Sequence, residues 1–480
     1  MERGQHNFPV IVQKKMKEKQ NNLFDRENVL ERKLTARQLT MVAIGSAIGT
    51  GLFMGSGLVI SYAGPGAIIS YAVAALIAFM MLMCLAEMTV QHPTAGSFGT
   101  HAEKYLGGWA GYLMRWSYWM INVLAIGSEV TAVALYMNYW LPNVPGWVWI
   151  LLFSLVIIYF NTRSVHYFGT LEYWFSMIKV TAILGFILLG TAIIFGIGTK
   201  PVGFSHYFNH GGFLPHGWIG IWLGIGMASF SYFGSELIAV TAGESQEPTR
   251  IIPKTMRLTA FRLILFYVLS MVVMLAIIPW DQSGTKEVVQ SPFVKVFSYL
   301  GIPAADHIMN FVLLIAALSA MNAQVYGATR MLFSLSRGGY APAVLGKLND
   351  QQIPVYALLL SSVGLFIAIV LNLFVPDAYN ILFGIVIFGG LFVWSMIFVT
   401  YFAFKKQNRQ QQLAYQAPFY PLTPALGLIL MVGVWVTLLF TPEWRFIWYV
   451  GVSWFVLISA LYYFIYRKKQ KGWTEEESVA

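Results

Sequence analysis

The chain has 480 residues, of which 57% are hydrophobic and 11% are charged, and its mean hydropathy is +0.63. A soluble domain carries about 25% charged residues, so this composition excludes an ordinary soluble protein. The single cysteine, Cys84, lies inside an apolar run, which excludes a disulfide framework and a cysteine-based metal site.

Apolar runs of about 20 residues recur along nearly the whole chain, and each can cross roughly 30 Å of hydrocarbon. We therefore predict an all-α integral membrane protein with 12 transmembrane helices. The predicted spans are 40–62, 66–91, 110–139, 147–161, 168–198, 217–240, 259–280, 304–332, 354–375, 380–404, 422–440 and 445–466.

Lysine and arginine are unevenly distributed between the two sides of these spans. The segments on the side of the N-terminus hold 26 of them, counting Arg115, Arg262 and Arg330 near span ends with their loops, and the opposite segments hold 4. This asymmetry predicts that both termini are cytoplasmic, with tails at 1–39 and 467–480 and no cleavable signal peptide. The net charge of +10 then reflects orientation in the cell membrane rather than binding to nucleic acid.

Small residues interrupt the first span at Ala43-Ile-Gly-Ser-Ala-Ile-Gly-Thr-Gly-Leu-Phe53. Each interior glycine costs a helix roughly 1 kcal/mol relative to alanine, so several together indicate backbone that leaves the helix. Unwound backbone in a bilayer must be buried in protein or line a watery cavity, where its N–H and C=O groups can bind a ligand. Gly45 and Gly49 also fit a Gly-x-x-x-Gly packing face, so this stretch alone leaves both interpretations open.

A second interruption lies in the sixth span, where Ser229, Ser231, Gly234 and Ser235 precede Glu236. Two interrupted helices in corresponding positions predict two inverted five-helix repeats and favour a binding site between them. A half-helix that begins after a break offers N–H groups to a carboxylate, and one that ends before a break offers carbonyls to an ammonium group. We therefore predict an α-amino acid as the substrate.

Charged residues inside the predicted spans are candidates for proton coupling. Lys179 lies about a dozen residues into the fifth span, where an ammonium group costs about 2.5–3.5 kcal/mol. Its depth favours a proton-releasing lysine beside the site over one that extends to the interface. Glu236 fits either a proton relay or a structural role, and we interpret Glu129 as structural. Phe230, beside the second break, is a candidate gate.

Several segments resemble one transporter family. Leu34-Thr-Ala-Arg-Gln-Leu-Thr-Met-Val-Ala-Ile-Gly-Ser-Ala-Ile-Gly-Thr-Gly-Leu-Phe-Met-Gly-Ser-Gly57 is similar to the first helix of bacterial amino acid permeases in the amino acid–polyamine–organocation (APC) superfamily. Ala242-Gly-Glu-Ser-Gln-Glu-Pro-Thr-Arg-Ile-Ile-Pro-Lys254 and Arg330-Met-Leu-Phe-Ser-Leu-Ser-Arg337 resemble two further segments of that branch. The resemblance covers roughly residues 30–465.

This resemblance implies a LeuT-like fold and secondary active uptake by proton symport. The ten-helix transport core would cover 40–404, with repeats at about 40–198 and 217–404, and two peripheral helices would cover 405–466. The resemblance also implies roles for individual residues. Backbone N–H groups would hold the substrate carboxylate near Ala47, Gly49, Thr50 and Gly51. Carbonyl oxygens would accept from its amine at Ile44, Phe230, Ser231 and Phe233. Phe230 would be the gate, and Lys179 with Glu236 would serve proton coupling. Ser46 borders the same pocket, where many members of the branch have glycine.

Other functions fit the sequence less well. An amino acid exchanger on the same fold, or a permease for a cationic amino acid, remains an alternative. A membrane enzyme would need convergent catalytic groups or metal ligands at membrane depth, and the sequence has none, so we predict no enzyme activity, cofactor or metal. A channel would need a repeated pore motif or a ring of like charges. Because no further acidic residue lies at the breaks unless Glu236 or Glu129 serves, we favour a neutral amino acid. The oligomeric state is not predicted.

Overall fold

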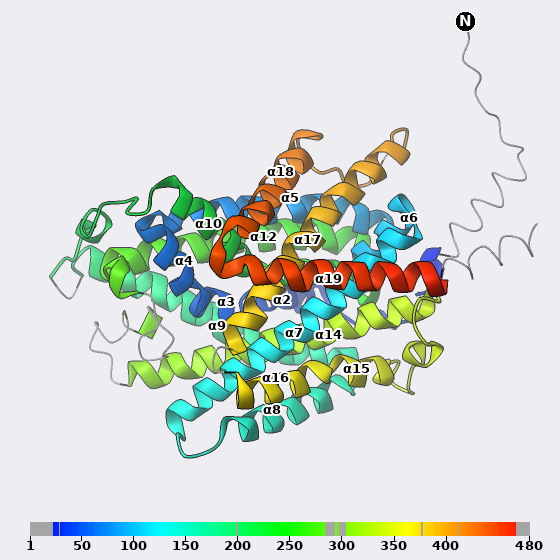
Figure 1. Ribbon diagram of the computed structural model, residues 1–480, viewed down its shortest axis with the longest axis horizontal. Coiled ribbons are helices and arrows are strands. Elements are labelled where there is room, and N and C mark those ends of the chain that lie inside the picture. The colour runs from blue at the N-terminus through cyan, green and yellow to red at the C-terminus, as the bar shows by residue number, and fades with distance from the viewer. Residues whose placement is uncertain are drawn as a thin grey trace, which may run out of the picture.

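The computed structural model describes residues 23–27, 29–197, 200–283, 293–294, 296, 304–375, 378–411 and 413–466. Within these residues the protein is helical, with an isolated β-bridge between Leu34 and Ser245. Figure 1 shows long helices packed side by side into one elongated bundle. Most of the predicted N-terminal tail, residues 1–22, and the predicted C-terminal tail, 467–480, lie outside the described residues.

The helices follow the apolar runs of the sequence. The first half of the chain forms α2 (Ala36–Ala47), α3 (Thr50–Phe53), α4 (Gly55–Ala63), α5 (Ala67–Gln91), α6 (Ser97–Leu106), α7 (Gly108–Trp140), α8 (Gly146–Asn161) and α9 (Val165–Ile194). The second half forms α10 (Gly217–Phe230), α11 (Leu237–Thr241), α12 (Pro248–Ile277), α14 (Ala305–Arg337), α15 (Val355–Ser361), α16 (Val363–Phe374), α17 (Ala378–Gln407), α18 (Leu422–Phe440) and α19 (Arg445–Leu461).

The described part of the chain has 8 helical segments that are long and apolar enough to cross a membrane, and three shorter apolar helices lie between them. The shorter ones are Gly146–Asn161, Gly217–Phe230 and Val355–Leu371. Large apolar side chains such as Leu155 and Ile429 are exposed on the outside of the bundle, as expected for contact with lipid. The prediction of an all-helical membrane protein is confirmed, whereas the count of 12 helices and the inverted repeats stay predictions.

Both predicted interruptions are present in the backbone. The first lies between the end of α2 at Ala47 and the start of α3 at Thr50. The second lies between the end of α10 at Phe230 and the start of α11 at Leu237. Two half-helices therefore end, and two begin, inside the bundle.

The three segments that carry the family resemblance contact one another. The backbone of Leu34 exchanges hydrogen bonds with that of Glu244 and Gln246, at 3.0 and 3.3 Å. The buried Glu244 side chain in turn forms an ion pair with Arg330, from Nε to Oε1 at 2.6 Å, and accepts a 2.6 Å hydrogen bond from the Tyr326 hydroxyl. This cluster joins the start of α2, the segment after α11 and the C-terminal end of α14.

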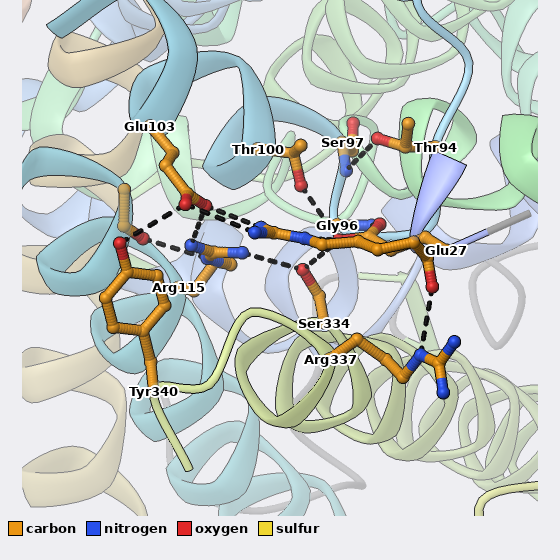
Figure 2. A network of polar contacts seen from close by, with 12 residues as sticks. Glu27, Thr94, Gly96, Ser97, Thr100, Glu103, Arg115, Ser334, Arg337 and Tyr340 are labelled. Carbon is orange, nitrogen blue, oxygen red and sulfur yellow. Dashed lines mark hydrogen bonds and ion pairs between the residues drawn. The ribbon is translucent and has the colours of Figure 1, made fainter. Parts of the chain in front are cut away.

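Helix α6 was not predicted, because its ten residues lie in a connection between two spans. The carboxylate of Glu27 lies at its N-terminus, where the Gly96 N–H donates to Oε2 at 2.6 Å. Thr100 and Ser334 donate hydroxyl hydrogen bonds to Glu27 Oε1 at 3.2 and 2.6 Å. A carboxylate is favourable there because of the positive end of the helix dipole. Figure 2 shows this network.

An ion-pair cluster adjoins this network (Figure 2), because Ser334 also accepts a 2.9 Å hydrogen bond from Arg115. Glu103 contacts Arg26 Nη2 at 2.6 Å and also pairs with Arg115 of α7, while the Tyr340 hydroxyl donates to it at 3.2 Å. Burial on its own would raise the pKa of Glu103, but Arg115 and Arg26 outweigh burial and hold it below its ordinary value. The cluster ties the segment before α2 to α6, α7 and the region after α14.

Candidate functional site

A cavity lies between the two interruptions. Its lining includes seven residues predicted for the site, namely Ser46, Ala47, Gly49, Gly51, Phe230, Phe233 and Glu236. The other lining residues are Tyr118, Ile121, Asn122, Ala125, Glu129, Gly234, Ala320, Gln324 and Val386. Ile44, Thr50, Ser231 and Lys179 are buried next to this region but do not line the cavity.

The two interruptions contact each other directly. The Ser46 hydroxyl donates to the carbonyl oxygen of Gly234 at 2.9 Å. Gly234 has a φ of +94°, and a Cβ at this position would meet the carbonyl oxygen of Ser46. A Cβ on Gly51 would lie 2.8 Å from Cδ1 of Phe230. Glycine at these two positions therefore allows the broken helices to approach closely on one side of the cavity.

The backbone at the first break is partly engaged in local hydrogen bonds. Gly49 is extended, with φ −114° and ψ −154°, and its N–H donates to the Ala47 carbonyl at 3.1 Å. The carbonyl of Ile44 accepts from the Ile48 N–H at 3.2 Å, and that of Ala47 also accepts from the Tyr267 hydroxyl at 2.9 Å. The first turn of α3 follows at once, and N–H groups at a helix start have no acceptor within the helix.

The two glycine interpretations apply to different glycines. A Cβ on Gly45 would meet the side chains of Ser176 and Glu172 on α9, so this residue allows close helix packing. Gly49 faces the cavity, where a Cβ would lie 2.9 Å from Ala320 Cβ and 3.0 Å from Glu129 Oε1. The first break therefore combines a packing glycine with a glycine that lines the cavity.

Aromatic rings form one wall of the cavity. The ring of Phe230 lies with its centroid 4.2 Å from that of Phe383 and 6.2 Å from that of Phe233. Ser231 lies away from the cavity, and its hydroxyl shares a 3.2 Å hydrogen bond with Tyr71. Phe230 is therefore positioned beside the space that a gate would close, and its gating role stays a prediction.

Glu236 holds the second break in place. Its carboxylate accepts hydrogen bonds from the Gly234 N–H, the Tyr118 hydroxyl and the Trp394 indole, all at 3.1 Å. These donors come from the break itself, from α7 and from α17. The contacts give Glu236 a positioning role, and its part in proton coupling stays a prediction.

Glu129 is a second carboxylate in the wall of the cavity. Its Oε1 accepts from the Thr50 hydroxyl at 3.1 Å, while its buried Oε2 has no hydrogen-bond partner among the described residues. Buried polar atoms are normally paired, so an open acceptor in a cavity wall is suited to a ligand or a proton. The sequence indicated a structural role for Glu129 and did not predict this contact with the cavity.

Lys179 lies directly behind the first break and is fully buried. Its Nζ donates to the carbonyl oxygens of Gly45 and Ile48 at 2.5 and 2.8 Å and to the Ser319 hydroxyl at 2.7 Å. These contacts use all three donors of an ammonium group. Lys179 therefore does not extend to the membrane interface, and it clamps the end of α2.

Sequence reasoning missed Glu172, which is also fully buried. Its carboxylate accepts a short hydrogen bond from Ser319 and a 3.1 Å hydrogen bond from Nδ2 of Asn322. The signal was present in the sequence, because Glu172 precedes Lys179 by seven residues in the same apolar run. Residues seven apart share one helix face.

The described residues contain no group of three or more His, Cys, Asp or Glu side chains placed to hold a metal ion. The absence of a cofactor stays a prediction.

Comparison with known proteins identifies the family. Residues 38–475 match the family described as "Amino acid permease". The chain belongs to this family. It is 38% identical to the uncharacterized amino acid permease YtnA of Bacillus subtilis (strain 168), covering 90% of this chain and 95% of YtnA.

Two further relatives have more specific names. The amino-acid permease RocC of Bacillus subtilis (strain 168) is 37% identical, over 92% of this chain and 96% of RocC. The aromatic amino acid transport protein AroP of Salmonella typhimurium (strain SL1344) is also 37% identical, over 90% of this chain and 95% of AroP. The chain is thus a multi-pass membrane permease of the APC superfamily, in a family of transporters rather than enzymes. The resemblance found in the sequence is confirmed at this level.

Proposed function

We propose that this permease imports an amino acid by proton symport with alternating access. The observation that carries the proposal is the buried Lys179, whose ammonium group binds the carbonyl oxygens of Gly45 and Ile48 at the break that borders the cavity. The protonation state of Lys179 is therefore linked to the shape of the binding site through the backbone of Gly45 and Ile48.

The amino acid would bind between the two breaks through its own backbone groups. Its carboxylate would accept hydrogen bonds from N–H groups around Ala47, Gly49, Thr50 and Gly51, near the positive end of the half-helix α3–α4. Its ammonium group would donate to carbonyls near Ile44 and the end of α10, around Phe230, Ser231 and Phe233. Both recognition elements are backbone, so they suit any α-amino acid, and Ser46 fixes the two breaks relative to each other.

Coupling would follow from the protonation state of Lys179. As an ammonium ion it satisfies Gly45, Ile48 and Ser319 together. As a neutral amine it has one donor fewer, so at least one of these contacts is lost. Loss of a contact to Gly45 or Ile48 would free the end of α2 to move, which links proton release to a change of access.

The walls of the cavity support a neutral amino acid as substrate. Ile121, Ala125, Phe233 and Val386 are apolar and leave room for an uncharged side chain. One observation favours a second candidate, a cationic amino acid, because the open Oε2 of Glu129 lies in the same wall. Replacing Glu129 by glutamine separates the two, since only uptake of arginine or lysine should then fall.

The test of symport is uptake of a radiolabelled mixture of the common L-amino acids into proteoliposomes. An inward proton gradient should drive accumulation by the wild-type protein, and Lys179→Ala should abolish accumulation while leaving the protein inserted. Uptake that ignores the gradient but requires amino acid inside the vesicles would instead indicate an exchanger. Unchanged accumulation by Lys179→Ala at every pH would rule out its role.

We also propose the orientation and the repeats that the sequence predicted. Both termini would face the cytoplasm, with inverted repeats at about 40–198 and 217–404 and peripheral helices in 405–466. The native Cys84 is buried, so it should not react with a membrane-impermeant maleimide. Cysteines introduced at Lys200 and Lys347 should then react from opposite sides, Lys200 from outside the cell. Labelling of both from one side would contradict the orientation.

A further inference from the structure

Lys179 and Glu172 lie on one face of α9 and are joined by a single hydroxyl group. Nearly two helical turns, about 10.5 Å along the axis, separate them. Ser319 of α14 lies between them, where its Oγ accepts from Lys179 Nζ at 2.7 Å and donates a short hydrogen bond to Glu172 Oε1. All three side chains are fully buried, so the chain of contacts is closed to bulk water.

The positive charge of Lys179 and the negative charge of Glu172 compensate each other across Ser319. The direct partners of the Lys179 ammonium group are uncharged oxygens, and Glu129 of α7 is the other acidic residue that acts on it besides Glu172. Glu172 accepts from Ser319 and Asn322 and has no direct contact with a cation among the described residues. A buried charge is unfavourable unless an opposite charge compensates it. Lysine and glutamate compensate each other through Ser319.

We propose that Glu172 is the next proton acceptor after Lys179, with the Ser319 hydroxyl carrying the proton between them. An N–H bond of Lys179 breaks as its proton passes to Ser319 Oγ, and the O–H bond of Ser319 breaks as its proton passes to Glu172 Oε1. The products are a neutral amine, a restored hydroxyl and a neutral carboxylic acid. The net charge of the core does not change, so the transfer avoids creating an uncompensated buried charge.

The position of Glu172 gives the relay a direction. It lies nearer the start of α9, whose first residues contact the start of α2, where Gln38 Nε2 donates to His166 O and Thr170 Oγ1 at 3.4 and 3.3 Å. Glu172 is therefore on the side of Lys179 that faces the N-terminal segment. With the N-terminus in the cytoplasm, the relay moves a proton inward, as symport requires.

Asn322 fixes the orientation of the Glu172 carboxylate. Its Nδ2 donates to Glu172 Oε2, and its own Oδ1 accepts from Asn161 at the end of α8, at 2.8 Å. The asparagine therefore fixes one oxygen of the carboxylate and leaves the other for Ser319. Glu172 is thus oriented for proton uptake rather than for contact with the substrate cavity, which it does not line.

The inference rests on the proposed symport, and its test separates the two. Glu172→Gln keeps the size of the side chain but cannot accept the proton. In proteoliposomes supplied with the radiolabelled L-amino acid mixture, we expect gradient-driven accumulation to fall at least about tenfold, within the range of coupling effects. Exchange of internal for external amino acid should continue at close to the wild-type rate. Its rate should not depend on the difference in pH across the membrane.

Glu87→Gln is the matched control, because Glu87 is an equally buried carboxylate on α5 that pairs with Lys405 and lies outside the relay. It should retain accumulation. Ser319→Ala should lose accumulation as Glu172→Gln does, while Ser319→Thr, which keeps a hydroxyl, should retain it.

The outcomes distinguish the two proposals. Wild-type protein that does not respond to the gradient would overturn both symport and relay. Glu172→Gln with wild-type accumulation would overturn the relay and leave symport standing. Loss of exchange together with accumulation in Glu172→Gln, with Ser319→Ala active, would show a structural role and would also overturn the relay.

Discussion

Replacing Gly234 by alanine tests whether contact between the two breaks shapes the substrate site. Gly234 adopts a φ of +94°, which L residues rarely adopt. The Cβ of alanine would also meet the carbonyl oxygen of Ser46, which is backbone and cannot rotate away as a side chain does. We therefore expect the end of α2 and the second break to move apart at Ser46 and Gly234.

The expected size of the effect follows from these contacts. A left-handed conformation costs a residue other than glycine about 1–2 kcal/mol. Loss of the 2.9 Å hydrogen bond from the Ser46 hydroxyl to the Gly234 carbonyl adds about 0.5–1.5 kcal/mol. Together they amount to about 1.5–3.5 kcal/mol, which would raise the dissociation constant for the amino acid about 10- to 400-fold.

The assay is binding of radiolabelled amino acid to purified protein by scintillation proximity. Ser46→Ala serves as the control, because it removes the hydroxyl and leaves the backbone free of strain. That control should weaken binding only about 2- to 12-fold. A Gly234→Ala protein that inserts normally and binds as tightly as Ser46→Ala would refute the reasoning.

Three further predictions concern binding, stability and pH. Gly49→Leu should abolish binding, because even a Cβ there would lie 2.9 Å from Ala320 Cβ, and wild-type affinity in a competition assay would contradict the proposed site. Glu244→Gln leaves the buried Arg330 without its counter-charge and should lower the free energy of unfolding by about 3–5 kcal/mol. The measurement is the thermal midpoint of unfolding in detergent, and an unchanged midpoint would show that the pair is not stabilising. Burial, with Lys104 and His101 nearby, lowers the pKa of His92 from 6.5 to about 3. Between about pH 6.5 and 3, His92 therefore binds a proton in the unfolded state but not in the folded state. The free energy of unfolding should fall as the pH falls through this interval, and it should fall less in His92→Gln.

Some features of the site could be predicted because their free-energy cost depends only on neighbouring residues in the sequence. Three glycines within seven residues weaken a helix wherever it packs, so the break at Ile48 and Gly49 was readable from the sequence. The depth of Lys179 was readable for the same reason, since a charge in the middle of an apolar run is costly in any fold.

Other features depend on pairing between distant segments, which one sequence does not reveal. The contact of Ser46 with Gly234 joins residues 188 positions apart. Glu129 could be placed at membrane depth, but which of its oxygens faces a cavity depends on the packing of α7 against α3 and α14. Helix α6 went unpredicted because it is a short helix between two spans, where Phe98, Ala102 and Tyr105 pack into the core and Glu27, distant in sequence, binds its N-terminus.

Gly45 shows why the packing and binding interpretations of the first break are not exclusive. Because it has no side chain, α9 lies close enough for Lys179 to bind the carbonyl of Gly45 at 2.5 Å. The same closeness puts Glu172 Oε1 only 2.5 Å from the place that a Cβ on Gly45 would take. A larger residue would therefore push away both ends of the proposed relay, even though it would not enter the cavity. The glycine that packs the helices is thus a condition for the contact between the lysine and the break, while Gly49 and Gly51 line the cavity.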